Sequence, residues 1–240
     1  MRRIAELVIV LASCAALTAC GSSSPKGARV GTALPVGRPS PKAVLASIVA
    51  AALAQNSVHW TESFPGAGIG YPPVRWSSDV TTDSGMQRVA ISGGGTVRAR
   101  LVNQVVYVRG NPMGLEYELN LWNSQRAKQY AGRWISIPKG DQLYAQTADG
   151  LTVASIVHDA TPEGTLKVVR NASHWTRLLV VSRISRASLS EGATGASVPV
   201  DFTLTPGLLG SPSGNFGRWN EPVHVQPPAT STPIATVRRG

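Results

Sequence analysis

"TVRARLVNQVVYVRGN", residues 96–111, alternates apolar and polar side chains over two successive runs. In the first run valine, alanine and leucine take one side of the chain, while Arg98 and Arg100 take the other. A period of two is typical of β-strands with one buried and one solvated face. The sequence therefore predicts two neighbouring strands of an antiparallel sheet here, with a basic outer face.

Further segments with strand character lie on both sides of this pair. They are rich in β-branched and aromatic residues and are separated by Gly, Pro and Asp turn signals. The segments span residues 57–64, 74–82, 86–92, 133–138, 165–171, 175–185 and 198–205. Consecutive runs of this kind predict an antiparallel meander with one solvated face.

A helical pattern precedes the first strand. Ser40 and Pro41 provide an N-cap and a first-turn proline. Apolar residues then recur at i, i+3, i+4, i+7 and i+8, at Leu45, Ile48, Val49, Ala52 and Leu53. This spacing predicts a helix with one apolar stripe, which must be covered by a sheet or by a ligand.

Two shorter helical patterns separate the strands. Leu115, Leu119 and Trp122 share one helical face, and Thr152 caps a later helix that includes Ile156. The order is thus helix, strands, helices, strands, without a repeated βαβ unit. The predicted fold class is therefore α+β, with helices against one face of an antiparallel sheet.

The N-terminal residues have the features of a bacterial lipoprotein signal peptide. Arg2 and Arg3 form a positive segment, and residues 7–16 are apolar but shorter than the ~20 residues that span a membrane. The following "LTAC" matches a lipobox, in which Cys20 receives a diacylglyceryl group. We expect this lipid to anchor the chain at the extracytoplasmic face of the cell membrane. A plain secretory signal with an incidental cysteine is the alternative.

Composition divides the chain into four expected parts. These are a signal peptide (1–19), the lipidated cysteine with a flexible Gly/Ser/Pro linker (20–40), a folded domain (41–228) and a flexible tail (229–240). Cys14 would leave with the signal peptide. The mature chain would then have no thiol beyond Cys20 and no disulfide.

No motif indicates catalysis, a metal or a cofactor. The four histidines are far apart in the sequence and lack metal-ligand spacing, and there is no G-x-S-x-G elbow. Ser136 and Lys139 satisfy S-x-x-K, but Pro138 and a strand-like run make the shared helix of that motif improbable. We therefore expect a protein that is not an enzyme and that holds no cofactor or metal.

The chain is basic, with 23 Lys and Arg against 13 Asp and Glu and a net charge of +10. Anionic lipid headgroups would suit such a charge, although arginines dispersed over a solvated surface explain it equally well. We expect no nucleic-acid partner, because no recognisable basic and aromatic module is present and the anchor places the domain outside the cytoplasm.

Four stretches, "QVVYVRGN", "QYAGRWISIP", "DGLTVASI" and "GRWNEPVHVQPP", resemble actinobacterial lipoproteins of the LppX, LprG, LprA and LprF kind. The resemblance implies a strongly curved antiparallel sheet, a half-barrel, with helices packed on its concave face and a hydrophobic cavity between them for an acylated lipid. It implies no catalytic residues. Residues 161–205 are hard to match to two tight hairpins, so the strand pairing there stays open, and a shortened sheet would reduce the cavity or close it.

The leading hypothesis is a membrane-anchored lipoprotein that binds an amphiphilic, acylated lipid for transport or presentation in the cell envelope. The candidate cavity residues are Leu45, Ile48, Val49, Leu53, Leu119, Trp122 and Ile156. The alternative is a non-enzymatic envelope interaction or sensor lipoprotein with the same fold and a filled core. Its partner surface would include Arg98 and Arg100, and the sequence does not identify the protein partner.

Overall fold

The computed structural model describes residues 40–66, 72–121, 124–161, 165–170, 176–181, 185–191, 199–206 and 212–239, with the backbone alone in the strands between 166 and 206. All of these residues belong to one compact unit, Pro39–Gly240. Cys20, the signal peptide and most of the linker lie outside the described residues, so their roles stay predictions.

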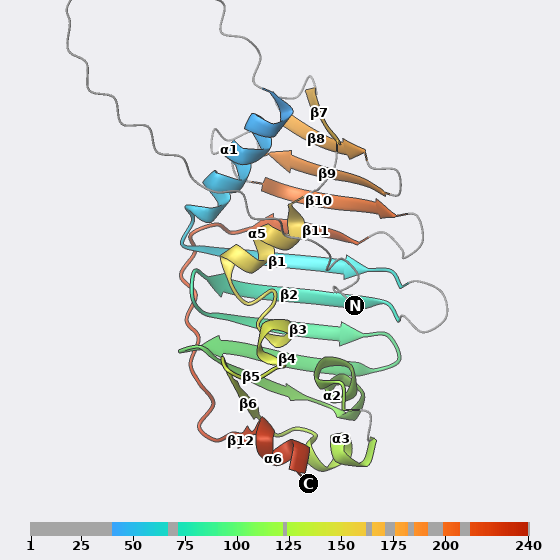
Figure 1. Ribbon diagram of the computed structural model, residues 1–240, viewed down its shortest axis with the longest axis vertical. Helices are drawn as coiled ribbons and strands as arrows, with labels where there is room; N and C mark the ends of the chain where they lie inside the picture. The colour runs from blue at the N-terminus through green and yellow to red at the C-terminus, as the bar shows by residue number, and fades with distance from the viewer. Residues whose placement is uncertain are drawn as a thin grey trace, which may run out of the picture. The chain divides into compact units, whose positions relative to one another are not determined.

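The described strands form one twelve-stranded sheet (Figure 1). They are β1 (Ser57–Phe64), β2 (Val74–Thr81), β3 (Gly85–Ile91), β4 (Gly95–Val102), β5 (Val105–Gly110), β6 (Ile135–Pro138), β7 (Thr165–Arg170), β8 (Thr176–Val181), β9 (Ser185–Glu191), β10 (Pro199–Pro206), β11 (Ser213–Gly217) and β12 (Thr232–Pro233). Their order across the sheet is β12-β6-β5-β4-β3-β2-β1-β11-β10-β9-β8-β7. Neighbours are antiparallel, apart from the parallel pair of β12 and β6.

Two meanders meet in the middle of this sheet. Strands β1 to β6 proceed to one edge, and β7 to β11 return from the other edge until β11 pairs with β1. The sequence left the strand pairing in residues 161–205 open, and the structure forms β7 to β10 there, strands of six to eight residues that pair in turn with one register shift between Pro199 and Asp201. Their hairpins were hard to recognise because the turns lack the Asn-Gly and Asp-Gly signals.

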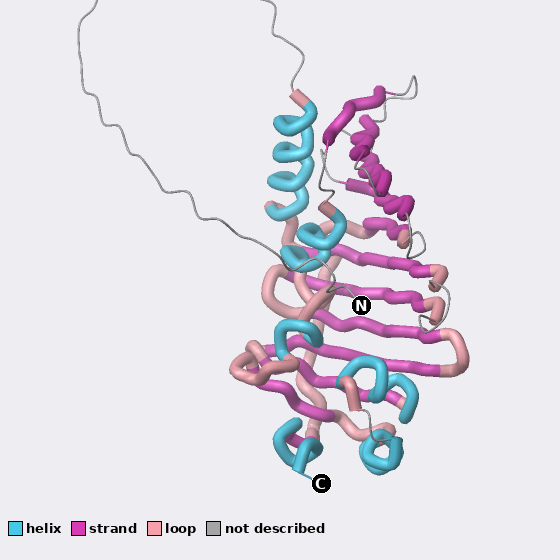
Figure 2. The backbone as a smooth tube through the Cα atoms, turned by 45° about the vertical axis from the view of Figure 1, so that its right-hand side comes forward, coloured by secondary structure: helices cyan, strands magenta, loops and turns pink. Residues whose placement is uncertain are grey.

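The helices gather on one face of the sheet (Figures 1 and 2). They are α1 (Pro41–Leu53), α2 (Pro112–Leu119), α3 (Ser124–Tyr130), α4 (Tyr144–Thr147), α5 (Val153–Ala160) and α6 (Ile234–Arg239). The sheet is curved but does not close, since β12 and β7 remain as its edges. The predicted α+β half-barrel class is therefore confirmed.

Local capping explains where the helices begin. Ser40 accepts a hydrogen bond from the Ala43 amide at 3.2 Å, and the proline that follows it occupies the first turn of α1. Thr152 and Ser155 form a capping box at the start of α5. Both caps were predicted from the sequence and are confirmed.

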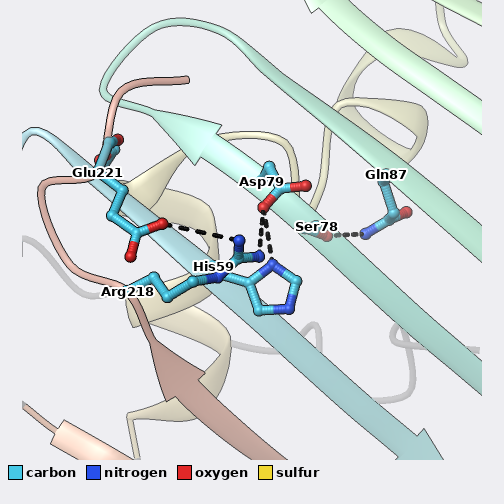
Figure 3. Close-up of polar contacts among 7 residues, drawn as sticks. His59, Ser78, Asp79, Gln87, Arg218 and Glu221 are labelled. Atoms are coloured by element: carbon cyan, nitrogen blue, oxygen red, sulfur yellow. Dashed lines mark hydrogen bonds and ion pairs between the residues drawn. The ribbon is translucent and has the colours of Figure 1, made fainter. Parts of the chain in front are cut away.

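The apolar core is divided into two clusters on the helix-bearing face. The α1 cluster lies under α1 and α5 and consists of Ile48, Ala52, Val58, Trp60, Val80, Val153, Ile156, Val157, Ala160 and Phe216. The α2 cluster lies under α2, α3 and α6 and includes Val89, Val97, Leu115, Leu119, Ile135 and Val237. Between them on the sheet, Gln87 Nε2 donates to Ser78 Oγ at 3.0 Å, and both side chains are buried (Figure 3).

The C-terminal residues are folded. The expectation of a flexible tail over 229–240 is wrong, because β12 pairs with β6 and Ile234 and Val237 are buried in the α2 cluster. Arg238 donates to both carboxylate oxygens of Asp141, at 2.6 and 2.7 Å. The prediction rested on the Pro, Ser and Thr content of this segment. The contacts of Ile234, Val237 and Arg238 nevertheless hold it on the domain.

An extended segment, residues 218–231, joins β11 to β12, and we call it the strap. Near its start Asn220 accepts a hydrogen bond from the Asn56 amide at 2.8 Å. Farther along, the Gln226 carbonyl accepts a hydrogen bond from Arg100 at 3.1 Å. Arg100 points away from the helices, because its strand neighbours Ala99 and Leu101 are buried on the helix-bearing face. The strap therefore runs over the face opposite the helices.

Candidate functional site

Four of the candidate cavity residues lie in the α1 cluster or pack against it. Ile48 and Ile156 are both 1% exposed and pack in that cluster together. Leu45 and Val49 are half-buried against the same cluster. Leu53 lies at the end of α1 with 47% of its surface exposed. The stripe of α1 is thus covered on one side and open to solvent on the other.

Two other candidate cavity residues are not part of this group. Leu119 is buried in the α2 cluster, which α2 and α3 cover. Trp122 lies outside the described residues. The buried and half-buried candidate residues that the structure describes therefore divide between two apolar clusters, one beside α1 and one under α2 and α3.

A hollow of about 1060 Å³ lies on the other face of the sheet. Its lining follows two rows of outward side chains that cross the strands. In the first row each residue is the cross-strand partner of the next, and the row consists of Asn215, Thr61, Ser77, Arg88, Arg98 and Arg109. The other is Ser213, Ser63, Arg75, Ala90 and Thr96. We call this hollow the arginine groove.

Burial shows on which face the arginine groove lies. Arg88 and Arg98 are exposed, whereas Val89 and Val97, which lie between the two rows, are 3% and 2% exposed and belong to the α2 cluster. Successive side chains of a strand point to opposite faces. The rows therefore form walls on the face opposite the helices, and the backbone between them forms the floor.

The groove is basic, and four arginines line it. Arg88 lies directly opposite Arg98, and Arg98 lies directly opposite Arg109. Arg75 belongs to the second wall. In the part of the chain that the structure describes, none of these four side chains has a hydrogen bond or an ion pair. The groove is thus arranged to attract anions.

Arg100, which the sequence suggested as part of a partner surface, is already engaged. Its guanidinium lies 4.8 Å from the centroid of the Trp134 ring, and it donates to the strap at Gln226. Sequence reasoning missed Arg75, Arg88 and Arg109 as groove residues. Each stands at an outward position of an alternating strand, but only the register between strands shows that they are neighbours.

A smaller hollow of about 210 Å³ lies where the strap crosses β1 and β2. His59 Nδ1 is 2.7 Å from Asp79 Oδ1, and Arg218 of the strap reaches the same carboxylate at 3.2 Å (Figure 3). Glu221 lies 3.7 Å from Arg218. The described lining of this hollow contains no hydroxyl or thiol side chain that His59 could activate as a nucleophile. These contacts bind the strap to the sheet.

Two further features of the described residues bear on function. No group of three or more His, Cys, Asp or Glu side chains there is placed to hold a metal ion. None of the described helices is long and apolar enough to cross a membrane.

The proteins that a search of solved structures finds include three with low sequence identity to this chain. LprF from Mycobacterium bovis has 14% identity and a TM-score of 0.45, and the match covers 81% of this chain and 100% of LprF. The lipoprotein LppX from Mycobacterium tuberculosis has 15% identity and a TM-score of 0.47, with 78% and 100% covered. A LolA superfamily protein from Nitrosomonas europaea has 10% identity and a TM-score of 0.28, with 78% and 96% covered.

Neither a scan against protein-family models nor a search of curated proteins finds a match. The structural neighbours LprF and LppX are two of the lipoproteins that the sequence was found to resemble. Because the identities are this low, function must come from the residues of this chain.

Proposed function

We propose that this chain is a membrane-anchored, non-enzymatic lipoprotein that binds an acylated lipid beside α1, for transport or presentation in the cell envelope. The observation that carries the proposal is the incomplete burial of the α1 stripe. Ile48 and Ala52 are buried, but Leu45 and Val49 are half-buried and Leu53 is exposed. An acyl chain along the open side would complete the burial of this stripe.

The energetics favour such a ligand. A 13-residue helix is marginal alone in water, and α1 depends on the apolar contacts of its stripe. Each methylene that moves from water to an apolar surface contributes about 0.8 kcal/mol. Leu45, Val49 and Leu53 offer such a surface at the border of the α1 cluster. A long acyl chain there gains several kcal/mol and stabilises α1 in turn.

The proposed anchor agrees with this arrangement. The compact unit begins at Pro39, so roughly 20 residues separate it from Cys20. As a flexible chain this segment would average roughly 25 Å from end to end. The domain could therefore reach the bilayer from which a lipid is taken. Labelling with palmitate that is abolished by Cys20→Ser would support the anchor, and labelling that persists would contradict it.

Native mass spectrometry tests the lipid site. Residues 39–240 contain both apolar clusters and all the described elements, so this unit should fold without its anchor. Purified from an actinobacterial host, it should carry one lipid per chain. Leu45→Gln with Val49→Gln should remove that lipid, because both side chains border the open side of α1.

A matched variant controls for effects on the helix itself. Ala46→Gln with Ala50→Gln changes two exposed positions of α1 and should keep the lipid. A protein that binds no lipid, or equal loss in both variants, would contradict the proposal. The first of these outcomes would favour the alternative of an interaction lipoprotein with a filled core.

A further inference from the structure

The arginine groove has a function of its own that does not depend on the lipid site beside α1. We propose that it docks the domain on an anionic bilayer, with Arg88, Arg98 and Arg109 binding the phosphates of lipid headgroups. The face opposite the helices would then lie against the membrane, and α1 would remain free on the other side.

The alignment of three arginines is the first argument. Adjacent strands lie about 4.8 Å apart, so the row from Arg88 to Arg109 places three cations within roughly 10 Å of backbone. Like charges directly opposite on neighbouring strands are destabilising. A folded protein keeps such a row at an energetic disadvantage, and an anionic partner removes that disadvantage.

The chemistry of the walls indicates phosphate as that partner. Arginine presents a planar fork of donors that binds phosphate oxygens in pairs. Hydroxyl groups of Thr61, Ser63, Ser77 and Thr96 in the same walls supply further donors. In the described part of the lining the only acidic residue is Glu62, which takes the opposite face by strand alternation.

The extent of the groove favours a surface over a small soluble anion. Its lining crosses β11, β1, β2, β3, β4 and β5, and its arginines are exposed rather than enclosed. The strap occupies the adjacent part of this face, where it binds Asp79 through Arg218. Asp79 is thus already paired, and the open basic area is the part that a membrane can approach.

Vesicle binding by the unit 39–240, which lacks the anchor, tests the proposal. It should bind vesicles of equal parts phosphatidylglycerol and phosphatidylcholine, and binding should weaken as salt rises. A variant with Arg88→Gln, Arg98→Gln and Arg109→Gln should bind about 100-fold more weakly, from ~1 kcal/mol per basic residue at an anionic surface. Its stability to urea should be no lower than that of the wild type, since the opposed charges are gone.

A second variant has the same change of net charge elsewhere. Lys42→Gln, Lys128→Gln and Lys139→Gln neutralise three exposed lysines outside the groove, and binding should fall less than fivefold. Equal losses in the two variants would overturn the proposal, as would equal binding to pure phosphatidylcholine. Failure of the lipid-cargo test would leave this result unaffected, because no bound lipid is needed here.

The orientation can be measured directly. The unit 39–240 contains no cysteine, so Ala90→Cys, in the groove wall, can carry one environment-sensitive dye. Anionic vesicles should shift its emission to the blue. The same dye at Ala46→Cys, on the exposed side of α1, should not respond. A response at Ala46 that equals or exceeds the response at Ala90 would overturn the proposal.

Discussion

Replacement of Arg238 by glutamine tests whether the C-terminal helix is part of the fold. Arg238 belongs to α6 and binds Asp141, which follows β6, through two hydrogen bonds of 2.6 and 2.7 Å. The Asp141 side chain is 10% exposed and that of Arg238 is 34% exposed. The change removes the cation and leaves a nearly buried carboxylate that keeps the hydrogen bond from the Leu143 amide but has lost its ion pair.

The expected loss follows from these contacts. Hydrogen bonds to charged groups contribute about 1.5 to 3 kcal/mol, and the partial exposure of Arg238 places this pair at the lower end. We expect Arg238→Gln to lower the free energy of unfolding by about 1.5 to 2 kcal/mol. The loss should be accompanied by easier detachment of α6, which would keep its buried Ile234 and Val237 and the hydrogen bond from Arg126 to the carbonyl of residue 238.

The same pair predicts a dependence on pH. The Arg238 guanidinium, by its hydrogen bonds, holds the pKa of Asp141 below its usual value of 3.8, although partial burial opposes this. A carboxyl group whose pKa is lowered by folding stabilises the fold at any pH above its pKa in the unfolded chain. This contribution is lost as the pH falls through the pKa of the group in the folded protein. The difference in the free energy of unfolding between the wild type and Arg238→Gln should therefore be constant near neutral pH and shrink below a pH of about 3.8.

Urea unfolding measures both effects. At an m-value of about 2 kcal/mol per molar, the midpoint of Arg238→Gln should fall by roughly 1 M near neutral pH. Arg239→Gln is the matched control, because Arg239 is exposed and donates to Ala235 of its own helix. A midpoint for Arg238→Gln that equals the midpoint of this control would refute the reasoning, as would a difference that persists in acid.

Two further substitutions test the packing of α2 and the cap of α5. Gly114→Ala places a methyl group against the Thr96 carbonyl oxygen and 2.9 Å from Val97 Cγ2, so α2 must move away from β4. We expect urea unfolding to show a loss of about 1 to 3 kcal/mol in the free energy of unfolding. The control Gly140→Ala, whose methyl group meets nothing within 4 Å, should change this free energy by less than about 0.5 kcal/mol, and equal effects of the two variants would contradict the packing argument. Thr152→Ala removes the acceptor for the Ser155 amide. It should lower the thermal midpoint by the amount that a loss of about 1 kcal/mol in the free energy of unfolding produces, whereas Thr152→Ser should retain the cap. A serine variant as unstable as the alanine variant would argue against capping.

The sequence predicted most of the local elements correctly because their signals are local. Ser40 and Thr152 begin helices as their caps indicate, and the alternation around Arg98 identifies β4 and its two faces. Helix caps and strand alternation involve residues within a few positions of one another, so they can be recognised without knowledge of distant parts of the chain.

The sequence did not show how distant segments meet. The pairing of β1 with β11 joins Trp60 to Phe216, and neither segment carries a signal that selects the other. The folding of the C-terminal residues depends on the edge of β6 and on the α2 cluster, which exist only after the sheet has formed. The polar composition of that segment therefore suggested a flexible tail.

The candidate sites divide in the same way. The α1 stripe was visible in the sequence, but its division into buried Ile48 and exposed Leu53 depends on where the helix lies on the sheet. Arg98 was recognised as an outward residue, whereas its place between Arg88 and Arg109 is set by strand register. A slip of one residue in either pairing would send a neighbour to the other face. By itself the sequence determined which side chains are basic and which face of each strand they take; the tertiary structure decided that three of them form one row, because register is fixed by the packing of the whole sheet.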